Sequence, residues 1–111
     1  MNADVGAPAP DFDLESDAGK YMSLSDFAGR WLVLYFYPRD NTPGCTIEAQ
    51  AFTEALPGFR QAGAEVVGVS RDSVLSHGSF RDKFNIRFPL LSDPELATHE
   101  AYGAWGTKVM Y

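Results

Sequence analysis

Cys45 is the only cysteine in the 111-residue chain, and it is the residue whose chemistry can best be placed. It comes at the end of a Pro- and Gly-containing loop, residues 38–44, which follows the apolar run from Trp31 to Tyr37. A lone cysteine is more often a small buried apolar side chain than a catalyst. In sheets of parallel strands, however, reactive groups gather in the loops beyond the carboxyl ends of the strands. This position therefore indicates a reactive cysteine.

The residues just before Cys45 predict a helix start. Thr42 suits the N-cap position and Pro43 suits the first helical position. Cys45 then lies in the first turn, among backbone N–H groups that have no acceptor within the helix. Those donors and the helix dipole favour an anionic sulfur, so a thiolate nucleophile is expected.

At these residues the chain resembles the peroxiredoxins, whose motif P-x-x-x-T-x-x-C is matched by Pro38, Thr42 and Cys45. The wider string over residues 37–46, followed by Glu48, is most similar to the PrxQ subfamily, also called bacterioferritin comigratory protein. Similarity to other parts of the family extends over nearly the whole chain, through residues 6–12, 64–73 and 88–93.

The resemblance implies an α/β, thioredoxin-like fold with a central β-sheet flanked by helices. It also implies reduction of hydrogen peroxide or organic hydroperoxides, with Cys45 becoming a sulfenic acid. Thr42 would hydrogen-bond the reacting oxygens and Pro38 would shield the sulfur from water. The N–H groups of Gly44 and Cys45 would stabilise the charge that develops as the O–O bond stretches. Glu48, on the same helix face as Cys45, would help to hold an active-site arginine, with a solvated helix acid as the alternative.

Two departures from the family pattern affect the expected cycle. Gln50 stands where many PrxQ-like proteins have a second, resolving cysteine, and the segment 73–84 offers none either. A one-cysteine cycle is therefore expected, in which an external thiol such as thioredoxin, glutaredoxin or a small thiol releases the sulfenic acid. The chain also ends at Tyr111, ahead of the closing β-β-α segment and the arginine that it carries in similar proteins. We therefore expect a chain truncated at its C-terminus, in which the missing arginine would take away part of the transition-state stabilisation.

Composition points to one α/β domain over residues 1–111. Hydrophobic residues make up 45% of the chain, which argues against disorder. The net charge of −6 disfavours nucleic acid and anionic membrane surfaces as partners. With no visible signal peptide and one unpaired cysteine, we expect a cytoplasmic protein. The expected partners are a hydroperoxide substrate and the external thiol reductant, and the expected assembly is a monomer or weak dimer without a cofactor.

The pattern of apolar and turn-forming residues predicts alternating strands and helices. The helix that starts at Thr42 should kink or break at Pro57–Gly58 and end near Gly63. The other expected elements are a hairpin within Asp11–Tyr21, a helical turn at Ser23–Ala28, strands at Trp31–Tyr37, Glu65–Ser70 and Pro89–Leu91, and helices at Ser73–Phe84 and Glu95–Tyr102.

His77 and His99 lack metal-ligand spacing, so we interpret them as residues on helix surfaces and expect no metal site. A dithiol oxidoreductase is disfavoured because there is no C-x-x-C pair. Two alternatives to a peroxidase stay open, namely a peroxide sensor that forms a mixed disulfide with a client protein, and a chaperone-like binding protein with weak turnover.

Overall fold

The computed structural model describes residues 6–104 and the backbone of residues 108–110. The strands are β1 (Asp13–Ser16), β2 (Tyr21–Ser23), β3 (Trp31–Phe36), β4 (Ala64–Ser70), β5 (Leu90–Ser92) and β6 (Lys108–Met110). The helices are α1 (Pro43–Gln61), α2 (Val74–Phe84) and α3 (Ala97–Ala101), with a short 3₁₀ helix, η1 (Leu24–Phe27), between β2 and β3. The expected order of elements is confirmed from β1 to α3.

These strands form one mixed sheet in the order β2-β1-β5-β4-β3-β6. The central strands β3, β4 and β5 are parallel, with Val33 opposite Val66 and Val69 opposite Leu91. The hairpin β1–β2 and the last strand, β6, join this centre antiparallel. Because the parallel strands end at one edge of the sheet, the loop after β3 lies close to the loop after β4.

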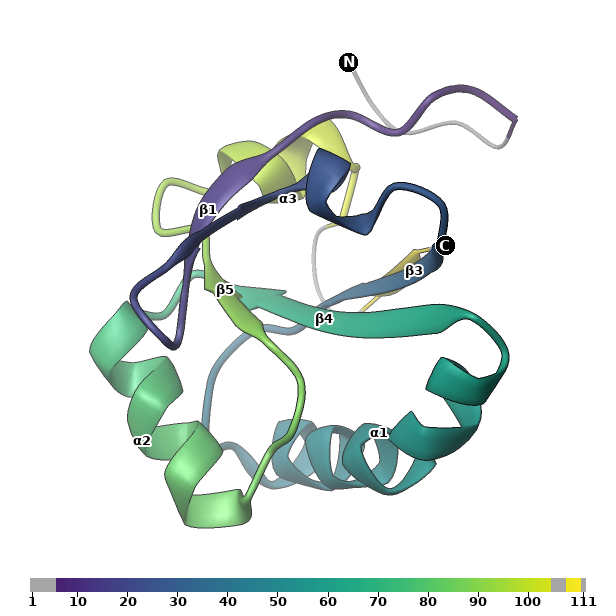
Figure 1. Cartoon of the computed structure of the whole chain (residues 1–111). Helices are drawn as coiled ribbons and strands as arrows, with labels where there is room; N and C mark the ends of the chain where they lie inside the picture. The colour runs from purple at the N-terminus through teal and green to yellow at the C-terminus, as the bar shows by residue number, and fades with distance from the viewer. Residues whose placement is uncertain (1–5, 105–107, 111) are drawn as a thin grey trace.

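Helices cover both faces of this sheet (Figure 1). α1 and α2 pack on one face, over a core that includes Tyr35, Val66 and Phe80. On the other face, η1 and α3 lie beside a second core that includes Phe27 and Phe36. The chain is therefore a three-layer α/β/α structure. Among the described residues, none of the helices combines the length and the apolar character needed to cross a membrane.

Two features differ from the expectation. We predicted a kink or an interruption at Pro57–Gly58, and the interruption is wrong because α1 runs unbroken for 19 residues with Pro57 inside it. The packing of its buried residues, Ala49 and Leu56 among them, against the sheet outweighs the hydrogen bond that proline removes. Strand β6, which pairs with β3, was not predicted from the sequence.

Candidate active site

Cys45 lies in the first turn of α1, where the sequence placed it. Its side chain is 8% exposed and belongs to the core between the sheet and α1. Pro38 and Gly44, which flank it along the chain, are exposed, while Thr42 is half-buried. The sulfur is thus largely shielded from water at the base of an accessible loop, an arrangement that limits solvation of a nucleophile without closing the site.

Thr42 takes the N-cap position but does not cap the helix with its side chain. Its hydroxyl instead donates to the carbonyl oxygen of Arg39 (3.1 Å), closing a turn in the loop. The Thr46 N–H donates to the Thr42 carbonyl oxygen (2.9 Å), so the N–H groups of Gly44 and Cys45 precede the helical ladder. Among residues 6–104 neither N–H has an acceptor, so both are available beside the cysteine.

Glu48 lies one helical turn beyond Cys45 and is half-buried. Its Oε1 atom is buried and has no hydrogen-bond partner among the described residues. Burial raises the pKa of the Glu48 carboxyl above its usual value. An acid in this setting gains from a nearby donor or cation, which disfavours the interpretation of Glu48 as a solvated helix acid.

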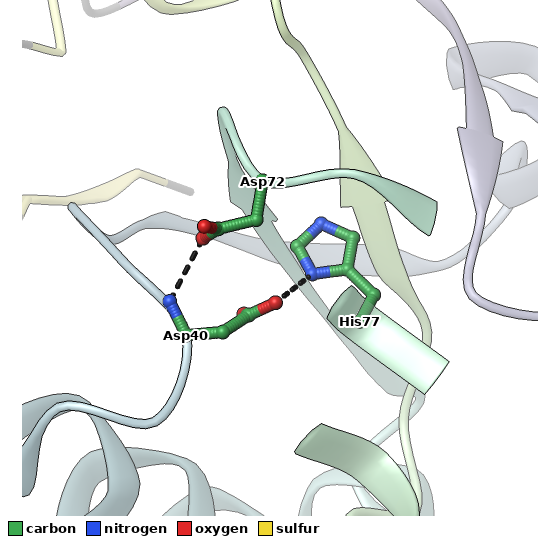
Figure 2. Close-up of side chains that lie close together, drawn as sticks. All are labelled: Asp40, Asp72 and His77. Carbon is green, nitrogen blue, oxygen red and sulfur yellow. Dashed lines mark hydrogen bonds and ion pairs between the residues drawn. The ribbon is translucent and has the colours of Figure 1, made fainter. Parts of the chain in front are cut away.

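Asp40 lies at the centre of a hydrogen-bond network (Figure 2) that was not predicted from the sequence. Asp40 belongs to the loop that leads to Cys45 and is 7% exposed. Its Oδ1 accepts from the Tyr37 hydroxyl (2.6 Å) and its Oδ2 from the Ser76 hydroxyl (2.8 Å). His77 Nδ1 lies 2.7 Å from the same Oδ2. The Asp40 N–H donates to Asp72 Oδ2 (2.8 Å), as Figure 2 shows.

The network fixes the charge on Asp40. Burial alone would raise the pKa of the Asp40 carboxyl, but the hydrogen bonds from His77, Tyr37 and Ser76 together lower it. Burial, and then the neighbouring Asp40 charge, raise the pKa of the Tyr37 hydroxyl well above its ordinary value. Asp40 is therefore an ionised acceptor, and Tyr37 is a neutral donor to it.

Both histidines are buried, so their interpretation as surface residues is wrong. His77 is 0% exposed and His99 is 5% exposed. Each lies 2.7 Å through Nδ1 from an aspartate oxygen, His77 from Asp40 and His99 from Asp93. A hydrogen-bond partner at this distance offsets the cost of burying each polar group. The signal that could have found His77 is its spacing with Phe80 and Phe84, because residues i, i+3 and i+7 share one helix face.

Asp40, Asp72 and His77 also lie close enough together to be considered as metal ligands, within 4.8 Å of one another. Their atoms are already engaged, however. His77 Nε2 lies 2.9 Å from the Leu91 carbonyl oxygen, and Asp72 Oδ2 accepts from Ser70 (2.7 Å) as well as from Asp40. A cation would have to displace these hydrogen bonds, so the cluster fits a positioning network better than a metal centre.

Comparison with known proteins places these features in a family context. The sequence pattern of the AhpC/TSA family matches residues 5–111. Peroxiredoxin Bcp of Bacillus subtilis (strain 168) is 44% identical over 108 residues, which are 97% of this chain and 69% of the relative. A putative peroxiredoxin bcp of Coxiella burnetii is 47% identical over 97% of this chain and 72% of that protein.

A solved structure gives the same result. Bacterioferritin comigratory protein of Xanthomonas campestris, studied for its alkyl peroxide reduction activity, is 48% identical with a TM-score of 0.79. The alignment covers 81% of this chain and 57% of that chain. This likeness confirms the thioredoxin-like fold, and the chain spans between 57% and 72% of these three proteins.

Proposed function

Because the chain belongs to the AhpC/TSA family, and within it to the peroxiredoxins of the Bcp/PrxQ type, we propose that it reduces hydroperoxides with Cys45 as the peroxidatic residue. The observation that carries the proposal is the position of Cys45 in the first turn of α1, beside amide donors that the helix does not use. The names of the relatives favour this function over the sensor and the chaperone-like alternatives.

In the proposed first step, the Cys45 thiolate attacks one oxygen of the hydroperoxide. The S–O bond forms as the O–O bond breaks, and the departing oxygen takes up a proton and leaves as water or an alcohol. Sulfur is oxidised by two electrons to a sulfenic acid, while the peroxide is reduced by two. The amides of Gly44 and Cys45 would stabilise charge on the reacting oxygens, and the hydroxyl of Thr42 would join them by turning from the Arg39 carbonyl oxygen to the bound peroxide.

We assign supporting roles to Pro38 and Glu48. Pro38, exposed at the start of the loop, would limit the access of water to the sulfur once peroxide is bound. Glu48 would accept a hydrogen bond from a cationic group of the assembled site. The buried, unpartnered Oε1 and the raised pKa of its carboxyl support that role, because both favour pairing with a positive charge.

Thiol reductants would complete the cycle. Gln50 leaves α1 without a second sulfur, and the chain contains no other cysteine. A first external thiol would therefore convert the sulfenic acid to a mixed disulfide and release water. A second thiol would regenerate Cys45 and carry away the disulfide. Thioredoxin, glutaredoxin and small thiols all supply this chemistry.

One experiment tests the assignment directly. Reduced protein is mixed with one equivalent of hydrogen peroxide, thiol loss is followed by stopped flow, and the product is identified by intact mass. We expect oxidation much faster than that of a free thiol, with addition of one oxygen. Cys45→Ser should consume no peroxide in the same assay. Oxidation of the wild-type protein no faster than a free thiol, or unchanged consumption by Cys45→Ser, would refute the proposal.

A further inference from the structure

The loop that leads to Cys45, residues 38–44 and here called the cysteine loop, is tied to the rest of the molecule at Asp40. Three side chains donate to its carboxylate, and its own N–H donates to Asp72. One donor, Tyr37, directly precedes the loop, and the other two, Ser76 and His77, lie in the first turn of α2. The contacts to α2 and to Asp72 thus join the loop to segments that are remote in sequence.

The conformation of the cysteine loop needs such an anchor. Asn41, the next residue, has a φ of 61°, in the left-handed region that side chains other than glycine rarely adopt. Directly after it, Thr42 turns back to bond the carbonyl oxygen of Arg39 (3.1 Å), and α1 begins at Pro43. A shift of Asp40 would therefore displace the Thr42 hydroxyl and the first turn that carries Cys45.

His77 is the rigid member of this anchor. It is fully buried, and its Nε2 lies 2.9 Å from the Leu91 carbonyl oxygen on β5. A carbonyl oxygen only accepts, so Nε2 must carry a hydrogen. The 2.7 Å contact between Nδ1 and Asp40 Oδ2 then requires a second proton between those atoms. The ring thus bridges the central sheet to the cysteine loop, with one nitrogen bonded to each.

We propose that His77 is a positioning residue for the peroxide reaction, which holds the Thr42 hydroxyl and the Cys45 sulfur in place by donating to Asp40 from a buried position on α2. The inference rests on the proposed peroxidase function. His77 itself touches none of the reacting atoms in this scheme, so its effect reaches Cys45 only through Asp40 and the cysteine loop.

Two substitutions separate the two ends of the ring. His77→Asn places an amide N–H near the position of Nδ1 and so keeps a donor for Asp40. His77→Gln places its amide near Nε2 and so keeps a donor for Leu91 while leaving Asp40 without its histidine partner. The matched control is His99→Gln, which breaks the same 2.7 Å contact between a buried Nδ1 and an aspartate oxygen on the other face of the sheet.

Each variant is examined by three measurements: backbone amide hydrogen exchange of residues 38–46, the rate of Cys45 oxidation by hydrogen peroxide, and the rate of its alkylation by iodoacetamide. In His77→Gln we expect exchange of the loop to accelerate and peroxide oxidation to slow about tenfold or more, since small misplacements of reacting groups are costly. The rate of alkylation should change by less than about threefold. Alkylation needs an accessible sulfur but no peroxide held in a fixed orientation, so a misplaced loop affects mainly the peroxide step. His77→Asn and His99→Gln should behave as the wild type in all three.

Several results would overturn the inference. These are an unchanged peroxide rate in His77→Gln, equal losses in His77→Asn and His77→Gln, or an equal loss in His99→Gln. If His77→Gln fails to fold, Ser76→Ala removes another donor to the same Asp40 oxygen and should shift loop exchange and peroxide rate in the same direction. Should the wild-type protein prove no faster than a free thiol, the proposed function fails, and loop exchange alone then decides whether His77 holds the loop.

Discussion

At the scale of single residues, the hydroxyl of Thr42 shows how a cap position can serve chemistry. An N-cap side chain ordinarily accepts from an amide of the first turn. Here the hydroxyl donates to Arg39, and the amides of Gly44 and Cys45 are left beside the sulfur. The helix forgoes one stabilising contact at its start, and the site keeps two donors for an anionic oxygen.

This arrangement predicts the behaviour of two Thr42 variants. Thr42→Val keeps the shape of the side chain but removes its hydroxyl, and with it both the bond to Arg39 and the donor that would turn to the bound peroxide. Oxidation of Cys45 by hydrogen peroxide should therefore slow about a hundredfold, as for loss of one donor from an oxyanion site. Thr42→Ser retains the hydroxyl and should stay near the wild-type rate. Stopped-flow measurement of thiol loss gives both values. Wild-type speed in Thr42→Val would remove the hydroxyl from the mechanism.

The sequence identified the residues of the motif but not their supports. Cys45, Thr42 and Pro38 could be found because their types and spacing carry the chemistry locally. Asp40 and His77 are 37 positions apart, and their contact depends on how β3 and α2 pack. No local pattern records such a pairing. His77 also looked polar enough for a helix surface, because a hydropathy pattern does not register that a buried aspartate will meet it.

At the scale of elements, the strands and helices could largely be predicted from patterns. The apolar run at Trp31–Tyr37 and the turn signal before Tyr21 predicted β3 and the β1–β2 hairpin. Pro57 was the exception. A proline usually interrupts a helix, but here the burial of the apolar face of α1 outweighs the hydrogen bond that Pro57 removes. β6 could not be predicted, since a three-residue strand depends on the neighbour with which it pairs.

The unbroken course of α1 leads to a stability prediction. Pro57 has no N–H to donate to the helical ladder, so Pro57→Ala should raise the free energy of unfolding by about 1–3 kcal/mol. Gly58→Ala is the reference for helix propensity alone, because a Cβ built there has no atom within 4 Å beyond its chain neighbours and the backbone of its own helix. It should gain about 1 kcal/mol. Urea unfolding checks both, and a less stable Pro57→Ala would mean that packing around the ring outweighs the missing bond.

At the scale of the whole molecule, each face of the sheet contains one buried histidine–aspartate pair. His77 and Asp40 lie on the side of α2, and His99 and Asp93 on the side of α3. Asp93 also accepts from the N–H groups of Thr98 (3.3 Å) and His99 (2.9 Å), at the start of α3. Each aspartate thus ties a helix to the end of a central strand or to the loop beyond it, and each is nearly inaccessible to water.

These pairs should govern how the protein unfolds in acid. Burial opposes ionisation of Asp93, but hydrogen bonds from His99 and Thr98 lower the pKa of its carboxyl. The pKa of the Asp40 carboxyl is lowered in the same way by its own hydrogen bonds. A carboxyl with a lowered folded-state pKa stabilises the protein above its unfolded pKa of about 3.9, and that stabilisation is lost as the pH falls through the folded value. Asp40→Asn and Asp93→Asn should each lower the free energy of unfolding at pH 7 by about 1–3 kcal/mol, the usual range for hydrogen bonds to charged groups.

The difference between each variant and the wild-type protein should then shrink as the pH falls below about 4, because the carboxyls of the unfolded wild-type chain take up protons there before those of the folded protein, and the difference is lost once the pH has fallen through the lowered folded-state pKa values. Urea unfolding at a series of pH values measures this directly, with Glu54→Gln, an exposed acid on α1, as the control that should change little at any pH. A difference that stayed constant down to the lowest pH would mean that the two aspartates act through packing and not through their charge.

The same two variants should differ in their effect on the reaction. Asp40→Asn should slow the oxidation of Cys45 by peroxide more than Asp93→Asn does, because only Asp40 belongs to the loop that leads to Cys45 at the start of α1.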